Sequence, residues 1–284
     1  MGKNSILGKG NILLIHGTWC NGGNWGEFAA EFERRGYTVH TPSYRYHGKP
    51  GDIDIWGNAQ KIAKLGLLDY VADLVDLVDT MDSPPMVIGH SLGCLLAQLL
   101  AARRQTRGLV LLGPAPTAGM FTLYPSALRL WSRYLPEWIL GKPMYPVSWE
   151  VWQKQVSNAL PVDISADYYS TLCAESGTAY RQMVFWFLDP KQSSRMDYSK
   201  VKAPVLVIGG SEDKCTPPGM CRGTAKNYGE SGKYVELKGS DHMMTVGPYL
   251  PKTLTVIDTW LTENDLVTVR PSVAKLNVMS EQIA

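Results

Sequence analysis

The chain has 284 residues, of which 45% are hydrophobic and 19% are charged, and its formal net charge is +2. That length allows one large domain, or a core with a smaller sub-domain, to bury a substantial apolar interior. The nearly neutral charge argues against a nucleic-acid-binding protein. A mean hydropathy of -0.12, without an apolar run of about 18 residues, argues against a membrane span.

Two features bear on where the protein works. The N-terminal residues lack the long apolar segment of a secretory signal. The five cysteines include no CxxC pair and leave one cysteine over, which is typical of reduced thiols. Together they predict a cytoplasmic protein, with monomer and dimer equally open.

Short apolar runs alternate with amphipathic stretches in the first part of the chain. Continuous apolar strands separated by helices indicate a mostly parallel sheet with helices on both faces. The expected strands are 11–15, 37–40, 86–88 and 109–112, and the expected helices are 25–35, 65–78 and 92–102. The alternation resumes after residue 200, with strands over 205–208 and 234–237, a helix after Pro218 and a last helix over 249–261.

The sequence therefore predicts an α/β core of about six strands, built from residues 1–114 and 200–263. Residues 115–199 differ in character, because they hold five of the nine tryptophans and show no clear strand. We interpret this stretch as a helical cap inserted into the core. An ordinary helical pair whose aromatic side chains only fill the interior fits the composition equally well. Residues 264–284 show no strong period and are predicted to form a C-terminal tail.

The segment Gly89–Gly93 reads GHSLG and matches the motif G-x-S-x-G. It lies between a predicted buried strand and a predicted apolar helix, which is the context that the motif needs. The serine must sit on a sharp strand-to-helix turn, and small residues on either side avoid clashes there. The motif therefore predicts Ser91 as a nucleophile.

A nucleophilic serine needs a base, and the base needs a carboxylate to orient it. In hydrolases with this motif the chain order is serine, then the acid, then histidine. Of the five histidines only His242 follows Ser91, in the loop after the last strand. The acid is expected after strand 205–208, where Asp213 is the first choice and Glu212 the alternative. Asp241, next to the histidine, is expected to be a solvated or turn-forming residue.

Acyl transfer also needs hydrogen-bond donors for the oxyanion of the tetrahedral intermediate. We expect one from the backbone N–H of Leu92, directly after the nucleophile. The other is expected from the loop after the first strand, from Thr18 or, as second choice, Trp19. His16 is predicted to brace this loop. The substrate pocket is expected to include Trp19, Met120, Trp131, Trp138 and Met243.

This set of motifs resembles the α/β-hydrolase superfamily and, within it, the plant methylesterase and hydroxynitrile-lyase group. The resemblance covers residues 10–115 and 200–262. It implies a triad of Ser91, Asp213 and His242, with the amides of Thr18 and Leu92 as the oxyanion hole. The lyases of the group carry threonine after the loop histidine and lysine after the catalytic histidine. This chain has Gly17 and Met243 there, so it lacks the groups that would bind a cyanohydrin and departing cyanide.

The expected function is that of a carboxylesterase-type serine hydrolase, cleaving esters with hydrophobic acyl or aryl groups through an acyl-enzyme. No cofactor is expected, and no metal, because Cys215 and Cys221 lack a matching histidine pair. The expected partner is a small-molecule ester. A lactonase, a C–C bond hydrolase or a lyase with the same triad is the first alternative. A non-catalytic protein that binds a ligand in the same fold is the second.

Overall fold

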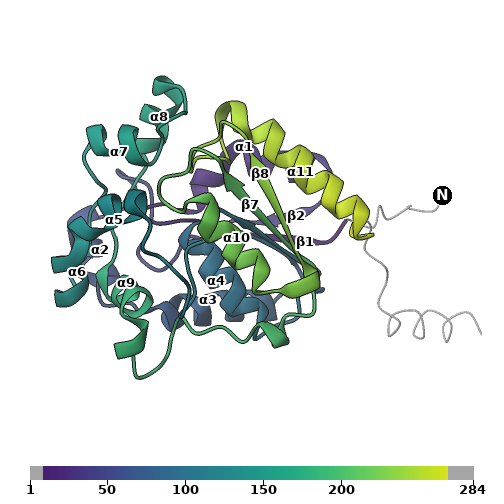
Figure 1. The fold of residues 1–284 in the computed structure, drawn as a ribbon, viewed down its shortest axis with the longest axis horizontal. Coiled ribbons are helices and arrows are strands. Elements are labelled where there is room, and N and C mark those ends of the chain that lie inside the picture. Colours follow the sequence, from purple (N-terminus) through teal and green to yellow (C-terminus); the bar gives the residue numbers. More distant parts are fainter. Residues whose placement is uncertain (1–8, 268–284) are drawn as a thin grey trace, which may run out of the picture.

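A computed structural model describes residues 9–267 and shows a twisted sheet between two layers of helices (Figure 1). All neighbouring strands of this six-stranded sheet are parallel, which confirms the predicted α/β architecture. The strand order is β2 (Thr38–His40), β1 (Asn11–Ile15), β3 (Met86–His90), β4 (Gly108–Leu112), β7 (Val205–Gly210) and β8 (Gly232–Leu237).

Successive side chains of a strand point to opposite faces of the sheet, and in these strands the side chains on both faces are apolar. Both faces are therefore covered by helices. In β1, Leu13 belongs to the apolar cluster that includes α3 (Leu67–Asp79), α4 (Leu92–Ala101) and α10 (Pro218–Lys226). The next residue, Leu14, belongs to the cluster under α1 (Gly26–Arg34) and α11 (Leu250–Glu263). The strands are buried on both sides, which explains their continuous apolar runs.

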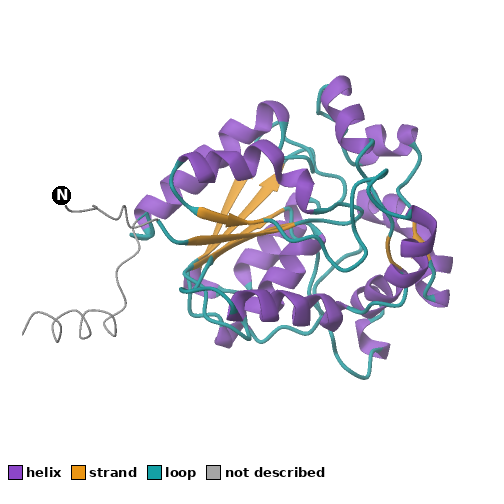
Figure 2. Cartoon of the chain, turned by 180° about the vertical axis from the view of Figure 1, so that it is seen from behind, coloured by secondary structure: helices purple, strands orange, loops and turns teal. Residues whose placement is uncertain are grey.

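The stretch between β4 and β7, called the insertion below, stands beside this core (Figures 1 and 2). Its helices are α5 (Pro125–Trp131), α6 (Leu135–Leu140), α7 (Trp149–Gln155), α8 (Val162–Tyr169) and α9 (Gly177–Val184). The sequence of this stretch shows no clear strand, but the structure contains a short antiparallel pair. Two strands of two residues each, β5 (Pro143–Met144) and β6 (Glu175–Ser176), pair antiparallel. Strands this short leave no alternation in the sequence.

A further helix, α2 (Ile55–Ile62), was not predicted, and it contacts the two short strands of the insertion. Most of the predicted C-terminal tail lies outside the described residues. Within residues 9–267, no helix combines the length and the apolar character that crossing a bilayer requires.

Candidate active site

Ser91 lies on the turn that joins β3 to α4, with φ 55° and ψ -118°. Positive φ is uncommon for a residue with a side chain and marks a strained position. The turn is so tight that a Cβ atom at Gly89 would lie 2.6 Å from the carbonyl oxygen of Gly93. A Cβ at Gly93 would lie 2.1 Å from the carbonyl oxygen of Ile15. Both flanking positions therefore require glycine.

Asp213 and His242 are joined by a short hydrogen bond at the ends of β7 and β8. The ring Nδ1–H of His242 donates to Oδ2 of Asp213 at 2.7 Å. The hydroxyl of Thr216 donates to the same oxygen at 2.9 Å. Oδ1 accepts the amides of Cys215 and Thr216 at 2.8 and 2.9 Å. Both oxygens of the buried carboxylate are thus satisfied by donors, which hold it in place and orient the imidazole.

Glu212, the alternative acid, points elsewhere. Its side chain is exposed, and its carboxylate accepts a hydrogen bond from the neighbouring Ser211 hydroxyl. The carboxylate that accepts the hydrogen bond of His242 belongs to Asp213, the residue after Glu212.

Asp241 differs from its prediction as a solvated or turn-forming residue, because its side chain is fully buried. Oδ2 accepts the amides of Ala159 and Leu160 in the insertion at 2.7 and 2.9 Å. Oδ1 accepts the amide of Met243 at 2.9 Å. Burial raises the pKa of this carboxyl, and the three amide donors counteract the rise. Asp241 therefore connects the loop of His242 to the insertion, a role that its position in the sequence does not reveal.

Two further buried histidines brace the loops of the site. The Nε2–H of His90 donates to the main-chain oxygen of His242 at 2.9 Å. The Nδ1–H of His16 donates to the carbonyl of Gly17 at 2.9 Å, and its Nε2 accepts the amide of Tyr44. Burial lowers the pKa of both rings to about 3, so both are neutral. His16 thus braces the loop after β1, as predicted.

The loop after β1 is held by the insertion. A turn closed by the Cys20 amide and the Gly17 carbonyl at 3.3 Å places Trp19 at φ 64°. The indole N–H of Trp19 donates to the carbonyl of Met144 in β5 at 3.1 Å. The hydroxyls of Thr18 and Tyr180 lie 2.5 Å apart. These contacts fix the backbone on which an oxyanion donor is expected.

Two cavities adjoin Ser91. The smaller, of about 20 Å³, is also lined by His242, the expected oxyanion loop and three aromatic side chains of the insertion. The larger, of about 500 Å³, is mostly apolar and extends into the insertion. Ser91, Trp131 and Cys215 line both cavities. Of the five expected pocket residues, Trp19, Trp131 and Met243 line the smaller cavity, and Met120, Trp131 and Trp138 line the larger.

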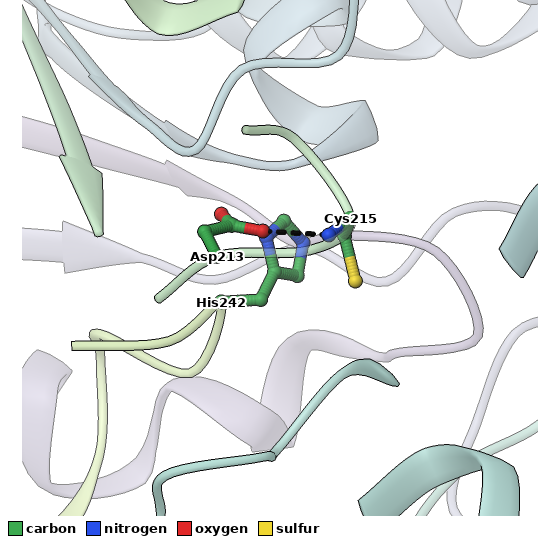
Figure 3. Close-up of side chains that lie close together, drawn as sticks. All are labelled: Asp213, Cys215 and His242. Atoms are coloured by element: carbon green, nitrogen blue, oxygen red, sulfur yellow. Dashed lines mark hydrogen bonds and ion pairs between the residues drawn. The ribbon is translucent and has the colours of Figure 1, made fainter. Parts of the chain in front are cut away.

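Asp213, Cys215 and His242 lie close enough for their side chains to share a metal ion (Figure 3). Their hydrogen bonds do not suit that use. The Cys215 thiol donates to the carbonyl of Gln155 at 3.4 Å, and burial raises the pKa of the thiol well above its ordinary value. The Asp213 carboxylate already accepts four hydrogen bonds, one of them from the ring of His242, so two of the three groups are already engaged with each other.

Two residues that support the site, Thr216 and Tyr180, were not predicted from the sequence. Thr216 lies three positions after Asp213, a spacing at which an aspartate accepts the following backbone amides, so a local signal existed. Tyr180 lies 162 positions from its partner Thr18, and no local pattern could connect them.

Comparisons with known proteins agree with this architecture. A monoacylglycerol lipase from Paleococcus ferrophilus superposes with a TM-score of 0.65, at 21% identity, over 89% of this chain and 94% of that chain. An extracellular alpha/beta-hydrolase from a Paenibacillus species gives 0.65, at 22% identity, over 87% and 98%. A methylesterase from Arabidopsis gives 0.64, at 12% identity, over 88% and 98%.

No curated protein sequence matches the chain. The profile of the Alpha/beta hydrolase family matches residues 12–249. Because that match covers most of the chain, the protein belongs to the alpha/beta hydrolase family.

Proposed function

We propose that the protein is a serine hydrolase that cleaves carboxylic esters with hydrophobic acyl or aryl groups through an acyl-enzyme. The observation that carries the proposal is the buried Asp213–His242 hydrogen bond, with the imidazole lining the same cavity as the strained Ser91. A hydroxyl, a base and an orienting carboxylate are the groups that nucleophilic catalysis by serine requires.

In this mechanism Ser91 attacks the ester carbonyl while His242 takes its proton. His242 then gives that proton to the leaving alcohol, and Asp213 stabilises the imidazolium that forms between these steps. The amides of Thr18 and Leu92 donate to the oxyanion, at the N-terminus of α4, whose dipole favours negative charge. Water, whose proton His242 takes, then attacks the acyl carbonyl. The bond to the Ser91 oxygen breaks, His242 returns the proton to that oxygen, and the carboxylic acid leaves. The smaller cavity has room for about one water molecule beside His242.

The acyl or aryl group would occupy the larger cavity. Its volume of about 500 Å³ lies within the range of small-molecule sites, and its lining is largely aromatic and aliphatic. In this proposal residues 115–199 act as a cap, because both cavities combine core residues with residues of the insertion. The structural neighbours named a monoacylglycerol lipase and a methylesterase are in line with an esterase.

The test combines covalent labelling with substrate assays. A fluorophosphonate probe should label the wild-type protein and leave Ser91→Ala unlabelled. Nitrophenyl esters of increasing acyl length should be hydrolysed, with longer apolar acyl groups preferred over acetate. Equal labelling and equal hydrolysis by wild type and Ser91→Ala would refute the proposal. Turnover of lactones or ring-cleavage diketones without turnover of simple esters would favour the alternative chemistry.

A further inference from the structure

Exposed large apolar side chains are concentrated in a few segments of the insertion. Thirteen such residues are exposed among residues 9–267, and nine of them come from the region of α5, α6 and the turn after α9. We call these nine the apolar face. They are Phe121, Leu123, Leu128, Leu135, Ile139, Leu140, Trp186, Phe187 and Leu188. Concentrations of exposed apolar surface on a folded protein mark sites of association.

The apolar face is continuous with the larger cavity. Five of its members, among them Leu123 and Phe187, also line that cavity together with the buried Ser91. Residues that are both exposed and cavity-lining must surround its mouth. An amphiphile held at the apolar face would therefore reach Ser91 without crossing bulk water.

Cations outnumber carboxylates around the apolar face. Residues 121–142 and 181–195 contain six cations and two carboxylates, whereas the whole chain carries only +2. In the part of the chain that the structure describes, none of the six cations forms an ion pair. Two of them, Arg181 and Lys191, line a surface hollow together with Ile139 and Leu188. The cations are Arg129, Arg133, Lys142, Arg181, Lys191 and Arg195.

Exposed apolar side chains bordered by unpaired cations suit an anionic lipid surface. The apolar groups enter the boundary between headgroups and acyl chains, while Lys and Arg side chains remain at the level of the lipid phosphates. A second copy of the same face would bring like charges together, which disfavours self-association.

We propose that the apolar face docks on anionic lipid surfaces and that the site takes its substrate, an ester with a long apolar chain, directly from that surface. The part concerning substrate rests on the proposed esterase function, whereas the docking does not. Lipid binding can therefore be measured on Ser91→Ala, without turnover.

The experiment is co-flotation of Ser91→Ala with two kinds of vesicle, phosphatidylcholine alone and phosphatidylcholine with about 30% phosphatidylserine. The second kind carries the negative surface charge that attracts Lys and Arg side chains. We expect binding to the anionic vesicles that weakens as salt rises, because salt screens the cations. The face variant combines Leu140→Ser and Leu188→Ser. These positions are 60% and 71% exposed and line neither cavity beside Ser91. The variant should bind the vesicles more weakly, by about tenfold per residue. Val162→Ser on α8, at 62% exposure, is the matched control and should bind normally.

In the otherwise wild-type enzyme, Leu140→Ser with Leu188→Ser should leave kcat/KM for a dissolved short-chain ester unchanged and lower the rate on vesicle-borne ester. Equal vesicle binding by the face variant and the Val162 control would overturn the docking. The docking would also be overturned if, in the absence of lipid, the Val162→Ser control formed a dimer and the face variant did not. That result would make the apolar face a contact between two copies of the chain. Vesicle binding without hydrolysis of any ester would retain the docking and refute the esterase function instead.

Discussion

His90, the residue just before Ser91, donates its Nε2–H to the main-chain oxygen of His242 at 2.9 Å. The two rings also lie with their centroids 4.7 Å apart. Because His90 is at the end of β3 and His242 follows β8, this bond couples two loops that are 152 positions apart in the chain. His90, next to the predicted nucleophile Ser91, thereby holds the loop that carries the predicted base His242.

The burial of His90 and of His16 makes the stability of the protein depend on pH in acid. His16 and His90 are buried with pKa values of about 3, whereas unfolded histidines titrate near 6.5. Between these values the unfolded state binds more protons than the folded state, so the free energy of unfolding falls as pH falls below about 6.5. The expected slope is about 1.4 kcal/mol per pH unit for each of these histidines. Urea denaturation between pH 7.5 and 5 measures it.

His90→Gln separates the titration from the hydrogen bond. Glutamine retains an N–H donor for the His242 carbonyl but takes up no proton. The variant should therefore lose about 1.4 kcal/mol per pH unit of the wild-type slope. A slope equal to that of wild type would contradict the assignment of His90 as a neutral buried ring.

The two adjacent carboxylates after β7 provide a matched pair for the acid. Asp213→Asn should lower kcat by about 10³–10⁴-fold, because an amide no longer selects the imidazole tautomer with hydrogen on Nδ1. Glu212→Gln should change kcat by less than about twofold, since its carboxylate is exposed and accepts a hydrogen bond from the Ser211 hydroxyl. Steady-state hydrolysis of a nitrophenyl ester compares the two. A larger loss in the Glu212 variant would show that the acid is misassigned.

Asp241→Asn tests the link between the base loop and the insertion. An amide presents an NH₂ group toward backbone N–H donors, so at least one of three charge-assisted hydrogen bonds is lost. We expect the free energy of unfolding to fall by about 2–3 kcal/mol. Asp163→Asn, an exposed carboxylate of α8, is the control and should shift it by less than about 0.5 kcal/mol. Equal stabilities of the two variants in urea would show that Asp241 has no anchoring role.

Gly93→Ala tests the tightness of the nucleophile turn. The added Cβ would lie 2.1 Å from the main-chain oxygen of Ile15, and backbone in the sheet cannot move away cheaply. We expect a loss of about 3 kcal/mol in the free energy of unfolding. Gly223→Ala in α10 is the opposite case, because its Cβ would meet only Met120 at 3.6 Å. That change should stabilise the protein by about 0.5–1 kcal/mol through helix propensity, and thermal denaturation of both variants gives the comparison.

The strands of the sheet were predictable because their signal is local. A parallel strand covered on both faces is a continuous apolar run, and β1 begins and ends at the predicted residues. Ser91 was recognisable for a related reason, since a turn that excludes any Cβ leaves glycine on both sides of the serine. Chain order then selected His242 and placed the acid after β7, and the structure joins the first-choice residue there, Asp213, to His242 by a hydrogen bond.

Other features depend on contacts between distant segments. The burial of Asp241 depends on backbone amides more than 80 positions away, and the support of Thr18 depends on Tyr180. The two-residue strands β5 and β6 exist only because their partners meet. The sequence by itself determined where the core strands lie and which candidate site residues follow them in the chain, since apolar patterning and glycine sterics act within a few residues. Only the tertiary structure decided which hydrogen bonds join the insertion to the loops of the site, and where the apolar face is exposed. Contacts between distant segments leave no periodic pattern in the sequence.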